Sequence, residues 1–156
     1  MATVEKEISK LDYEVGVIFD KNGHVISVQL GNEDTVSFTN YQIRKMKGAD
    51  VTHNHPTGVR PSPEDLYLYL DSGANSFRTT GRKGTYVLES SMDFSKLPDF
   101  KEFSREYNNI VDNIRDRYIT TSNDINDLYD ALAKLDTDLW ERLYKKYGVM
   151  PRFEER

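Results

Sequence analysis

Two histidines one residue apart, with an aspartate shortly after them, are the residues of this sequence best suited to chemistry. The segment VTHNHPTGVRPSPEDL (51–66) holds His53 and His55, two of the three histidines in the chain, and also Asp65. Imidazole and carboxylate groups are common zinc ligands, and a catalytic zinc typically takes three protein ligands and leaves a fourth position for water. Such a site lowers the pKa of water toward ~7 and polarises a substrate carbonyl.

The residues around the histidines predict a strand, a short loop and a helix, in that order. The segment ADVTHNH (49–55) is typical of a strand. Because side chains at positions i and i+2 of a strand share a face, we expect His53 and His55 to point the same way. Asp65 lies in the first turn of a helix predicted over 62–73, and a short loop can fold that turn back over the strand end. The three side chains are therefore candidates for one metal site.

The same residues have a second interpretation in which no metal is bound. Ser62, Pro63 and Asp65 have the spacing of a helix N-terminus with a capping box. Asp65 would then only cap the helix, and the two histidines would be loop-edge residues hydrogen-bonded to the backbone. The residues alone leave both interpretations open, and they do not exclude each other, since Ser62 can cap the helix while Asp65 binds a metal.

Hydrophobic patterns predict the elements that must position these residues. The predicted elements before and after the histidine segment are a short polar helix (3–11), a hairpin around Asn22-Gly23 (13–30), a turn with a short strand (31–38), a helix (39–48) and a second hairpin (76–90). Residues 1–90 therefore indicate an α+β domain, with a mixed or antiparallel sheet and flanking helices.

Residues 91–156 have a different pattern and predict a helical C-terminal extension. Apolar residues recur there at steps of three and four, which is typical of helices that face a core. These helices either pack on the sheet domain or offer a surface to a protein partner. The predicted core-facing residues are Phe100, Phe103, Tyr107, Ile110, Ile114, Tyr118, Ile125, Leu128, Leu132, Leu135, Leu139, Trp140, Leu143 and Tyr147.

The composition limits the class of protein. The chain has 156 residues, no cysteine, a net charge of −5 and a pI near 5.2. The lack of cysteine excludes disulfides, cysteine-based zinc sites and a thiol nucleophile. The negative charge disfavours nucleic acid as a partner, and with it a nucleotide or nucleic-acid hydrolase. No apolar run approaches the ~20 residues of a membrane helix, and the N-terminus lacks a signal peptide's apolar stretch, so we expect a cytoplasmic protein.

The segment HNHPTGVRPSPED (53–65) resembles the signature of the JAB/MPN (JAMM) metalloproteases. In that signature, His-x-His-Pro is followed by a short loop and by Ser-x-x-Asp. The residues are most similar to the RadC-type and phage-associated branches of the family, although the interval between His55 and Ser62 is one residue shorter than usual. The resemblance covers roughly residues 12 to 90 and implies a cytidine-deaminase-like α+β fold.

The resemblance also implies a role for each residue of the site. His53, His55 and Asp65 would bind zinc, and the hydroxyl of Ser62 would help to stabilise the developing oxyanion. The family also uses a glutamate from an early strand as the general base that acts on the attacking water. Glu14, in YEVGVIFD, is the candidate for that glutamate.

Two classes of function are compatible with these residues. The first is a zinc-dependent hydrolase that cleaves a peptide or isopeptide bond in a protein or peptide substrate. The second is a non-catalytic JAB-like module of a phage or mobile element, used for interaction or morphogenesis and docking through its C-terminal helices. An enzyme needs Glu14 within hydrogen-bond reach of the attacking water, directly or through one further water, whereas a docking module does not. Glu5 and Glu7 are alternative candidates for this base.

Overall fold

The chain divides into two compact units. The first consists of Met1–Ser90 and Pro151–Arg156, and the second of Ser91–Met150. Within the described part of the chain, none of the helices combines the length and the apolar character needed to cross a membrane. The structure, a computed structural model, describes residues 1–57, 60–89, 97–118 and 125–155.

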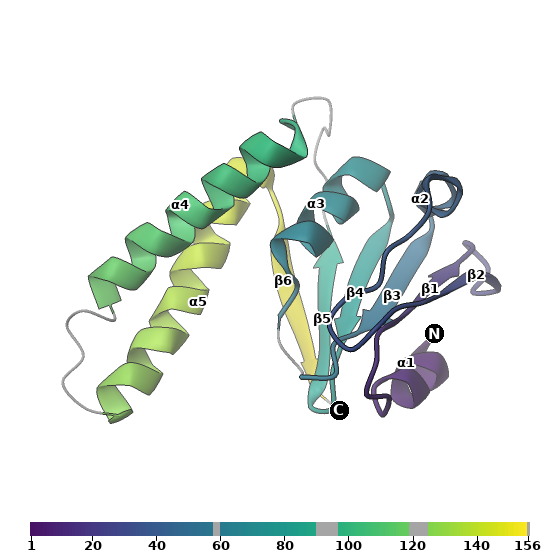
Figure 1. Cartoon of the computed structure of the whole chain (residues 1–156), viewed down its shortest axis with the longest axis horizontal. Coiled ribbons are helices and arrows are strands. Elements are labelled where there is room, and N and C mark those ends of the chain that lie inside the picture. Colours follow the sequence, from purple (N-terminus) through teal and green to yellow (C-terminus); the bar gives the residue numbers. More distant parts are fainter. Residues whose placement is uncertain (58–59, 90–96, 119–124, 156) are drawn as a thin grey trace. The chain divides into compact units, whose positions relative to one another are not determined.

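The first unit is built on a six-stranded mixed sheet. Its strands are β1 (Val15–Phe19), β2 (Val25–Leu30), β3 (Asp50–Asn54), β4 (Ser76–Thr80), β5 (Gly84–Glu89) and β6 (Met150–Glu155). Their order across the sheet is β2-β1-β3-β4-β5-β6 (Figure 1). Strands β3 and β4 are parallel, whereas β1 is antiparallel to β2 and β3, and β4 is antiparallel to β5. The predicted α+β class with a mixed sheet is confirmed.

Helices cover both faces of this sheet. The helices of the first unit are α1 (Ala2–Ile8), α2 (Asn40–Met46) and α3 (Pro63–Ser72). Helix α1 lies over one face, where Ile8 packs in a cluster with Val17. Helix α3 lies over the other face, where one of its tyrosines contacts Phe77. The two faces are distinct because Val17 pairs with Thr52 while Phe77 pairs with Val51, and neighbouring residues of a strand point to opposite faces.

Several predicted boundaries agree with the structure. Strands β1 and β2 form the hairpin predicted over 13–30, and Gly23 in its turn has a φ of 82°. Helix α3 begins after Ser62, whose side chain accepts a hydrogen bond from the backbone N–H of Asp65, and it ends at Gly73. The start and end of this helix are therefore set by residues that are visible in the sequence: the capping serine, the proline after it and the terminal glycine.

The short strand predicted within 31–38 is wrong. This segment is a loop turned by Asn32, whose side-chain oxygen accepts hydrogen bonds from the backbone N–H groups of Asp34 and Thr35, each at 2.9 Å. An asparagine side chain that binds nearby backbone groups offers them an alternative to pairing in a sheet. The polar turn signal therefore outweighed the β-branched residues that follow it.

The described part of the second unit consists of two antiparallel helices, α4 (Phe100–Tyr118) and α5 (Ile125–Tyr147). Glu106, near the start of α4, accepts hydrogen bonds from Lys146 and Tyr147 at the end of α5. The predicted core positions are confirmed for Phe103, Tyr107, Ile114, Leu139, Trp140, Leu143 and Tyr147. Ile110 is half-buried and Phe100 is exposed, while the side chains of Tyr118, Ile125, Leu128, Leu132 and Leu135 lie outside the described residues.

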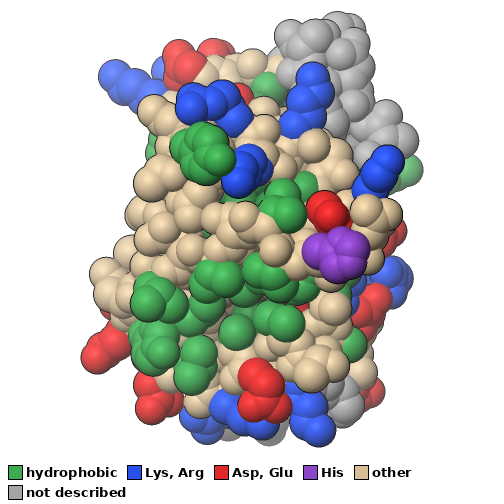
Figure 2. Space-filling model, turned by 90° about the vertical axis from the view of Figure 1, so that its right-hand side faces the viewer, with side chains coloured by type: hydrophobic (Ala, Val, Ile, Leu, Met, Phe, Trp, Pro, Cys, Tyr) green, Lys and Arg blue, Asp and Glu red, His purple; other side chains and the backbone are tan. Residues whose placement is uncertain are grey.

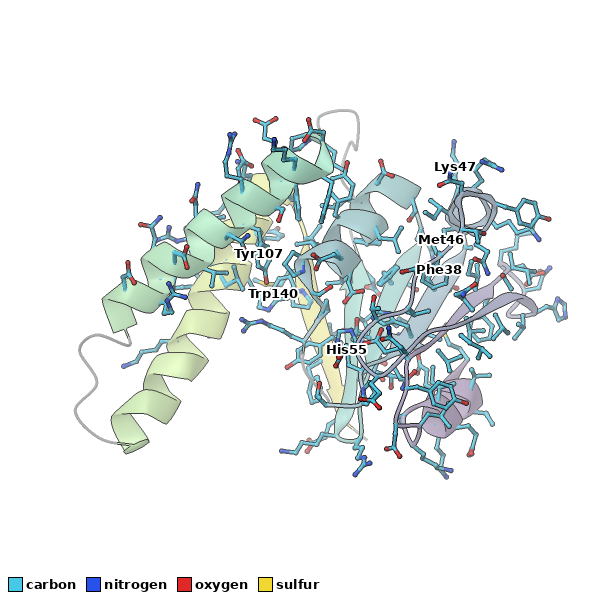
Figure 3. All side chains as sticks on the ribbon, in the orientation of Figure 1. Phe38, Met46, Lys47, His55, Tyr107 and Trp140 are labelled. Carbon is cyan, nitrogen blue, oxygen red and sulfur yellow. The ribbon has the colours of Figure 1, made fainter. Side chains whose placement is uncertain are left out.

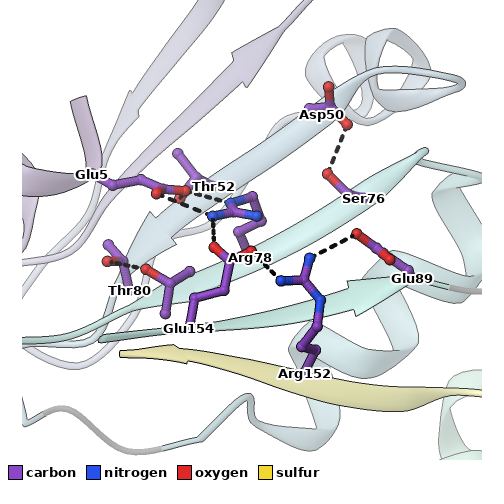
Figure 4. Close-up of polar contacts among 10 residues, drawn as sticks. Glu5, Asp50, Thr52, Ser76, Arg78, Thr80, Glu89, Arg152 and Glu154 are labelled. Atoms are coloured by element: carbon purple, nitrogen blue, oxygen red, sulfur yellow. Dashed lines mark hydrogen bonds and ion pairs between the residues drawn. The ribbon is translucent and has the colours of Figure 1, made fainter. Parts of the chain in front are cut away.

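The helical extension predicted over 91–156 needs a correction at its end, because the chain returns there to the sheet. Gly148 ends α5 with a φ of 62°, and β6 follows as the neighbour of β5. Arg78 of β4 joins this strand to α1: its guanidinium donates to Glu5 at 2.5 Å and to Glu154 at 2.6 Å (Figure 4). The partners Arg78 and Glu154 lie 76 positions apart, so no local pattern indicates the strand.

Candidate metal centre

His53 and His55 meet at the C-terminal end of β3. Their Nε2 atoms are 3.0 Å apart, and both side chains are buried on one face of the sheet, as strand alternation predicts. This is the face that α3 covers, since the His53 ring contacts Phe77 at a centroid distance of 5.3 Å. His55 lies one residue past β3, where its backbone N–H donates to the carbonyl of Thr80 at 2.9 Å. In Figure 3 it lies at the end of the strand away from Lys47.

Asp65 reaches both histidines from the first turn of α3. Its Oδ1 is 3.1 Å from Nε2 of His53, and its Oδ2 is 3.3 Å from Nε2 of His55. The Oδ2 atom also accepts from the backbone N–H of Ser62 at 2.7 Å, and Oγ of Ser62 accepts from the backbone N–H of Asp65 at 3.1 Å. Asp65 therefore takes part in the cap of α3 and contacts both histidines at the same time. Because Oγ acts only as an acceptor in this pair, the Ser62 hydroxyl keeps its own hydrogen to donate.

Glu14 approaches the histidines from the residue just before β1. Gly16 lies across from His53 in the antiparallel β1–β3 pair, so the same register places Glu14 across from His55 and on the same face. Oε1 of Glu14 is 3.7 Å from Nε2 of His55, and the side chain is buried. Glu14, His53 and His55 offer ligand atoms that all lie within 4.8 Å of one another, and this buried group can hold a metal ion.

The loop between β2 and α2 holds Glu14 and covers the strand beside it. The backbone N–H of Glu14 donates to the carbonyl of Asn32 at 2.7 Å, and its carbonyl accepts from Gly31 at 2.8 Å. Phe38 of the same loop lies directly over Gly16, where an added Cβ would be 2.2 Å from the ring. A glycine at this position therefore lets the aromatic ring close over the strand next to His53.

Asn54, between the two histidines, is a site residue that the sequence did not reveal. Its Oδ1 accepts from the backbone N–H of Val15 at 2.6 Å, and its Nδ2 donates to the carbonyl of Tyr13 at 2.9 Å. The side chain is fully buried. Its amide thus takes the place of backbone pairing at the end of the β1–β3 ladder and fixes the residues on both sides of Glu14. The only sign of this role in the sequence was the position of the amide side chain, between two residues that were expected to do chemistry.

Burial and nearby charges shift the pKa values of the two carboxyl groups of the site in opposite directions. Burial raises the pKa of Glu14, and this effect exceeds the opposing attraction of His53 and His55 and a hydrogen bond from the backbone of Val36. Burial also acts to raise the pKa of Asp65, but the charge of His53 and hydrogen bonds from both histidines outweigh it and hold this pKa well below its ordinary value. An ionised carboxylate beside a more basic one is the combination that general base catalysis requires.

The two alternative candidates for the base lie elsewhere. Glu5 is buried on the opposite face of the sheet, where it binds the Arg78 guanidinium and accepts from Oγ1 of Thr52 at 3.3 Å (Figure 4). Glu7 is exposed and pairs with Lys10 at 2.8 Å. Neither belongs to the group around the histidines, so of the three candidate glutamates Glu14 is the one near their Nε2 atoms.

The facing donor atoms of the site favour a bound cation. Comparison with protein-family models, with curated proteins and with solved structures finds no match. Two imidazole nitrogens 3.0 Å apart must share a proton or bind a cation, because their lone pairs repel each other. A divalent cation would engage both Nε2 atoms and a carboxylate at once.

Proposed function

We propose that this chain is a zinc-dependent hydrolase of the JAB/MPN (JAMM) type, which cleaves a peptide or isopeptide bond in a protein or peptide substrate. The observation that carries the proposal is the convergence of His53, His55 and Asp65, with Glu14 next to them but farther away. The four residues also have the types and the chain order of the signature that the sequence resembles.

The spacing of the three nearest groups supports a tetrahedral metal such as zinc. A tetrahedral zinc with bonds of about 2.0–2.1 Å holds its ligand atoms roughly 3.3–3.4 Å apart. The two Nε2 atoms are 3.0 Å apart, and Asp65 places Oδ1 at 3.1 Å from Nε2 of His53 and Oδ2 at 3.3 Å from Nε2 of His55, so a different oxygen faces each imidazole. Glu14, at 3.7 Å from the nearer imidazole, leaves more room and suits a role beyond the ligand set.

Each residue then has a distinct role in the proposed reaction. When bound, the metal supplies Lewis acidity, which lowers the pKa of water and polarises the substrate carbonyl. The Glu14 carboxylate takes the proton of the attacking water and later passes it to the leaving amine, a role that its raised pKa suits. Ser62 donates its hydroxyl hydrogen to the carbonyl oxygen as negative charge develops there. Asn54 keeps the Glu14 segment in place.

The metal is tested by measuring the zinc content of untagged protein by inductively coupled plasma mass spectrometry. We expect about one zinc per chain in the native protein, and none in the His53→Ala/His55→Ala double variant, since both imidazoles are lost. His24→Ala is the matched control, because His24 lies in the exposed β1–β2 turn. Native protein that takes up no zinc, even after zinc is added and the excess is removed by dialysis, would rule out the proposed site.

The reaction is tested with Glu14→Gln, which keeps the size of the side chain but cannot accept a proton in the same way. We expect unchanged zinc content and a loss of about 10²–10⁴-fold in the hydrolysis of quenched peptide and lysine-isopeptide substrates. Glu7→Gln, at an exposed position of α1, is the matched control. Zinc-loaded native protein that hydrolyses none of these substrates would instead favour the non-catalytic interaction module.

A further inference from the structure

The two edges of the sheet differ in how they are protected from pairing with other strands. Strands β2 and β6 are the edge strands. Edge strands of native proteins commonly carry proline and charged side chains, which prevent another strand from adding to them. The β6 sequence, MPRFEE, contains a proline and three charged residues, whereas the β2 sequence, VISVQL, contains neither. Strand β2 therefore lacks the proline and charges that protect β6, and its one irregularity is a bulge at Ile26, where the register with β1 shifts between Ser27 and Val25.

The exposed side chains of β2 form an aliphatic row. Val28 pairs with Val17 and Leu30 with Val15, so this row continues the apolar face of β1 on which α1 packs, beyond the reach of that helix. Figure 2 shows hydrophobic side chains gathered on the side of the molecule where β2 and α1 lie. The row and its exposed fractions are Val25 (49%), Ile26 (38%), Val28 (53%) and Leu30 (64%).

The opposite face of β2 is partly covered and polar. Ser27 and Gln29 alternate with the aliphatic residues and are half-buried, and Oγ of Ser27 accepts from the side chain of Gln42 in α2 at 3.1 Å. A strand that is polar where it is covered and aliphatic where it is exposed reverses the usual pattern of a solvated edge. A contiguous exposed apolar row next to an open strand edge indicates an interaction surface.

We propose that β2 is the interface between two copies of this chain, whose β2 strands pair antiparallel about a two-fold axis at Val28. The two sheets then form one continuous sheet. A two-fold axis perpendicular to the sheet keeps the same face up in both copies, so each aliphatic residue must lie across from another. Pairing Val28 with its own copy, and Ile26 with Leu30, aligns more of the aliphatic row than a shift in either direction.

The charges at the two ends of β2 complement this arrangement. The turn before the strand exposes Lys21, and the loop after it exposes Glu33 and Asp34. Asp20, in the same turn as Lys21, keeps its negative charge, but its carboxylate accepts hydrogen bonds from the backbone N–H groups of its own turn and so faces that turn, which leaves Lys21 to meet the partner. Antiparallel pairing brings the lysine end of each copy to the acidic end of the other, which favours a second copy of this chain over an uncharged apolar peptide.

The association is tested by sedimentation velocity on the native chain. We expect the fraction of dimer to rise with concentration between about 5 and 500 μM, as is usual for a weak interface formed by one pair of strands. Val28→Lys should remain monomeric, because two lysines would meet at the axis, and circular dichroism checks that it is folded. Tyr144→Lys, also 53% exposed but on α5, should dimerise like the native chain. A native chain that stays monomeric throughout, or two variants that behave alike, would overturn the proposal.

The register is tested by cross-linking, because the chain has no cysteine of its own. Residues directly opposite in an antiparallel pair have Cα atoms about 4.5–5.5 Å apart, which suits a disulfide. We expect Val28→Cys to form a disulfide-linked dimer under mild oxidation and Tyr144→Cys to stay monomeric. A disulfide-linked dimer of Tyr144→Cys together with a monomeric Val28→Cys would place the contact away from β2 and contradict the proposal. The interface is independent of the metal site, so neither experiment depends on zinc.

Discussion

Oδ1 of Asn54 accepts a hydrogen bond from the backbone N–H of Val15 at 2.6 Å. This contact joins the end of β3, where the two histidines meet, to the start of β1, directly after Glu14. The second hydrogen bond of the same amide, to the carbonyl of Tyr13, closes the other side of Glu14. The residue between the histidines therefore fixes the backbone on both sides of Glu14 and so helps to set where its carboxylate lies.

Asn54→Ala tests this connection. The variant leaves the buried N–H of Val15 without its partner, so we expect the free energy of unfolding to fall by about 1–3 kcal/mol, measured by urea denaturation. Asn75→Ala is the matched control, because Asn75 bonds Asp50 at an exposed position and should change stability by no more than about 0.5 kcal/mol. Equal effects from the two variants would mean that the Asn54 amide has no special role.

Asn54→Ala also separates positioning of Glu14 from metal binding. His53 lies in β3, His55 directly follows it and is held by its backbone bond to Thr80, and Asp65 lies in α3, so the variant should keep the zinc content of the native chain. If the proposed reaction is correct, kcat should fall while KM changes little, because only the placement of the base is disturbed. Loss of zinc in this variant would instead show that Asn54 supports the ligands.

Removal of the metal should lower the Tm only of proteins whose metal site is intact. A ligand that binds the folded chain alone stabilises it by RT ln(1 + [L]/Kd), which is about 2.7 kcal/mol at one hundred times Kd. We therefore expect a strong chelator to lower the Tm of the native chain but not that of His53→Ala/His55→Ala, measured by differential scanning calorimetry. His24→Ala should respond to the chelator like the native chain. A native Tm that the chelator leaves unchanged would count against a metal that stabilises the fold.

The sequence predicted the local parts of the site well, because each depends on short-range rules. Alternation along a strand places His53 and His55 on one face, and the order serine, proline and acid begins α3 with Asp65 in its first turn. Both inferences need only the backbone geometry of a few neighbouring residues. The hairpins and the glycine helix ends were predictable for the same reason.

Two of the parts that the sequence did not predict depend on contacts between distant residues. Asn54 reaches Val15 across 39 positions, and Arg78 reaches Glu154 across 76. The order of the strands decides both contacts, and no periodic pattern encodes that order. The loop over Gly16 was missed for a different reason: a single asparagine at its start replaced the expected strand with a turn.

Ser62 and Asp65 share a capping box, and two substitutions should separate capping from metal binding. Ser62→Ala removes the acceptor at the start of α3, so we expect a loss of about 0.5–2 kcal/mol in the free energy of unfolding with zinc content unchanged. Asp65→Asn keeps a side-chain oxygen for the backbone N–H of Ser62 but loses the charge, so zinc affinity should fall at least about 10-fold. Competition with a chromophoric chelator measures the affinity. Native zinc affinity in Asp65→Asn would remove this residue from the ligand set.

Phe38 and Gly16 should behave as a coupled pair in a double-mutant cycle. In the native chain, Gly16→Ala places a Cβ 2.2 Å from the Phe38 ring, so we expect a loss of about 1–3 kcal/mol in the free energy of unfolding as the ring is displaced. In a Phe38→Ala background the space is open, and the same substitution should stabilise the strand by about 0.5–1 kcal/mol, since alanine loses less backbone entropy than glycine. Urea denaturation of the four proteins gives the coupling, and additive effects would show that the ring does not rest on Gly16. Because Gly16 lies across from His53, this reversal of sign would also establish that the loop before α2 forms a wall of the candidate site.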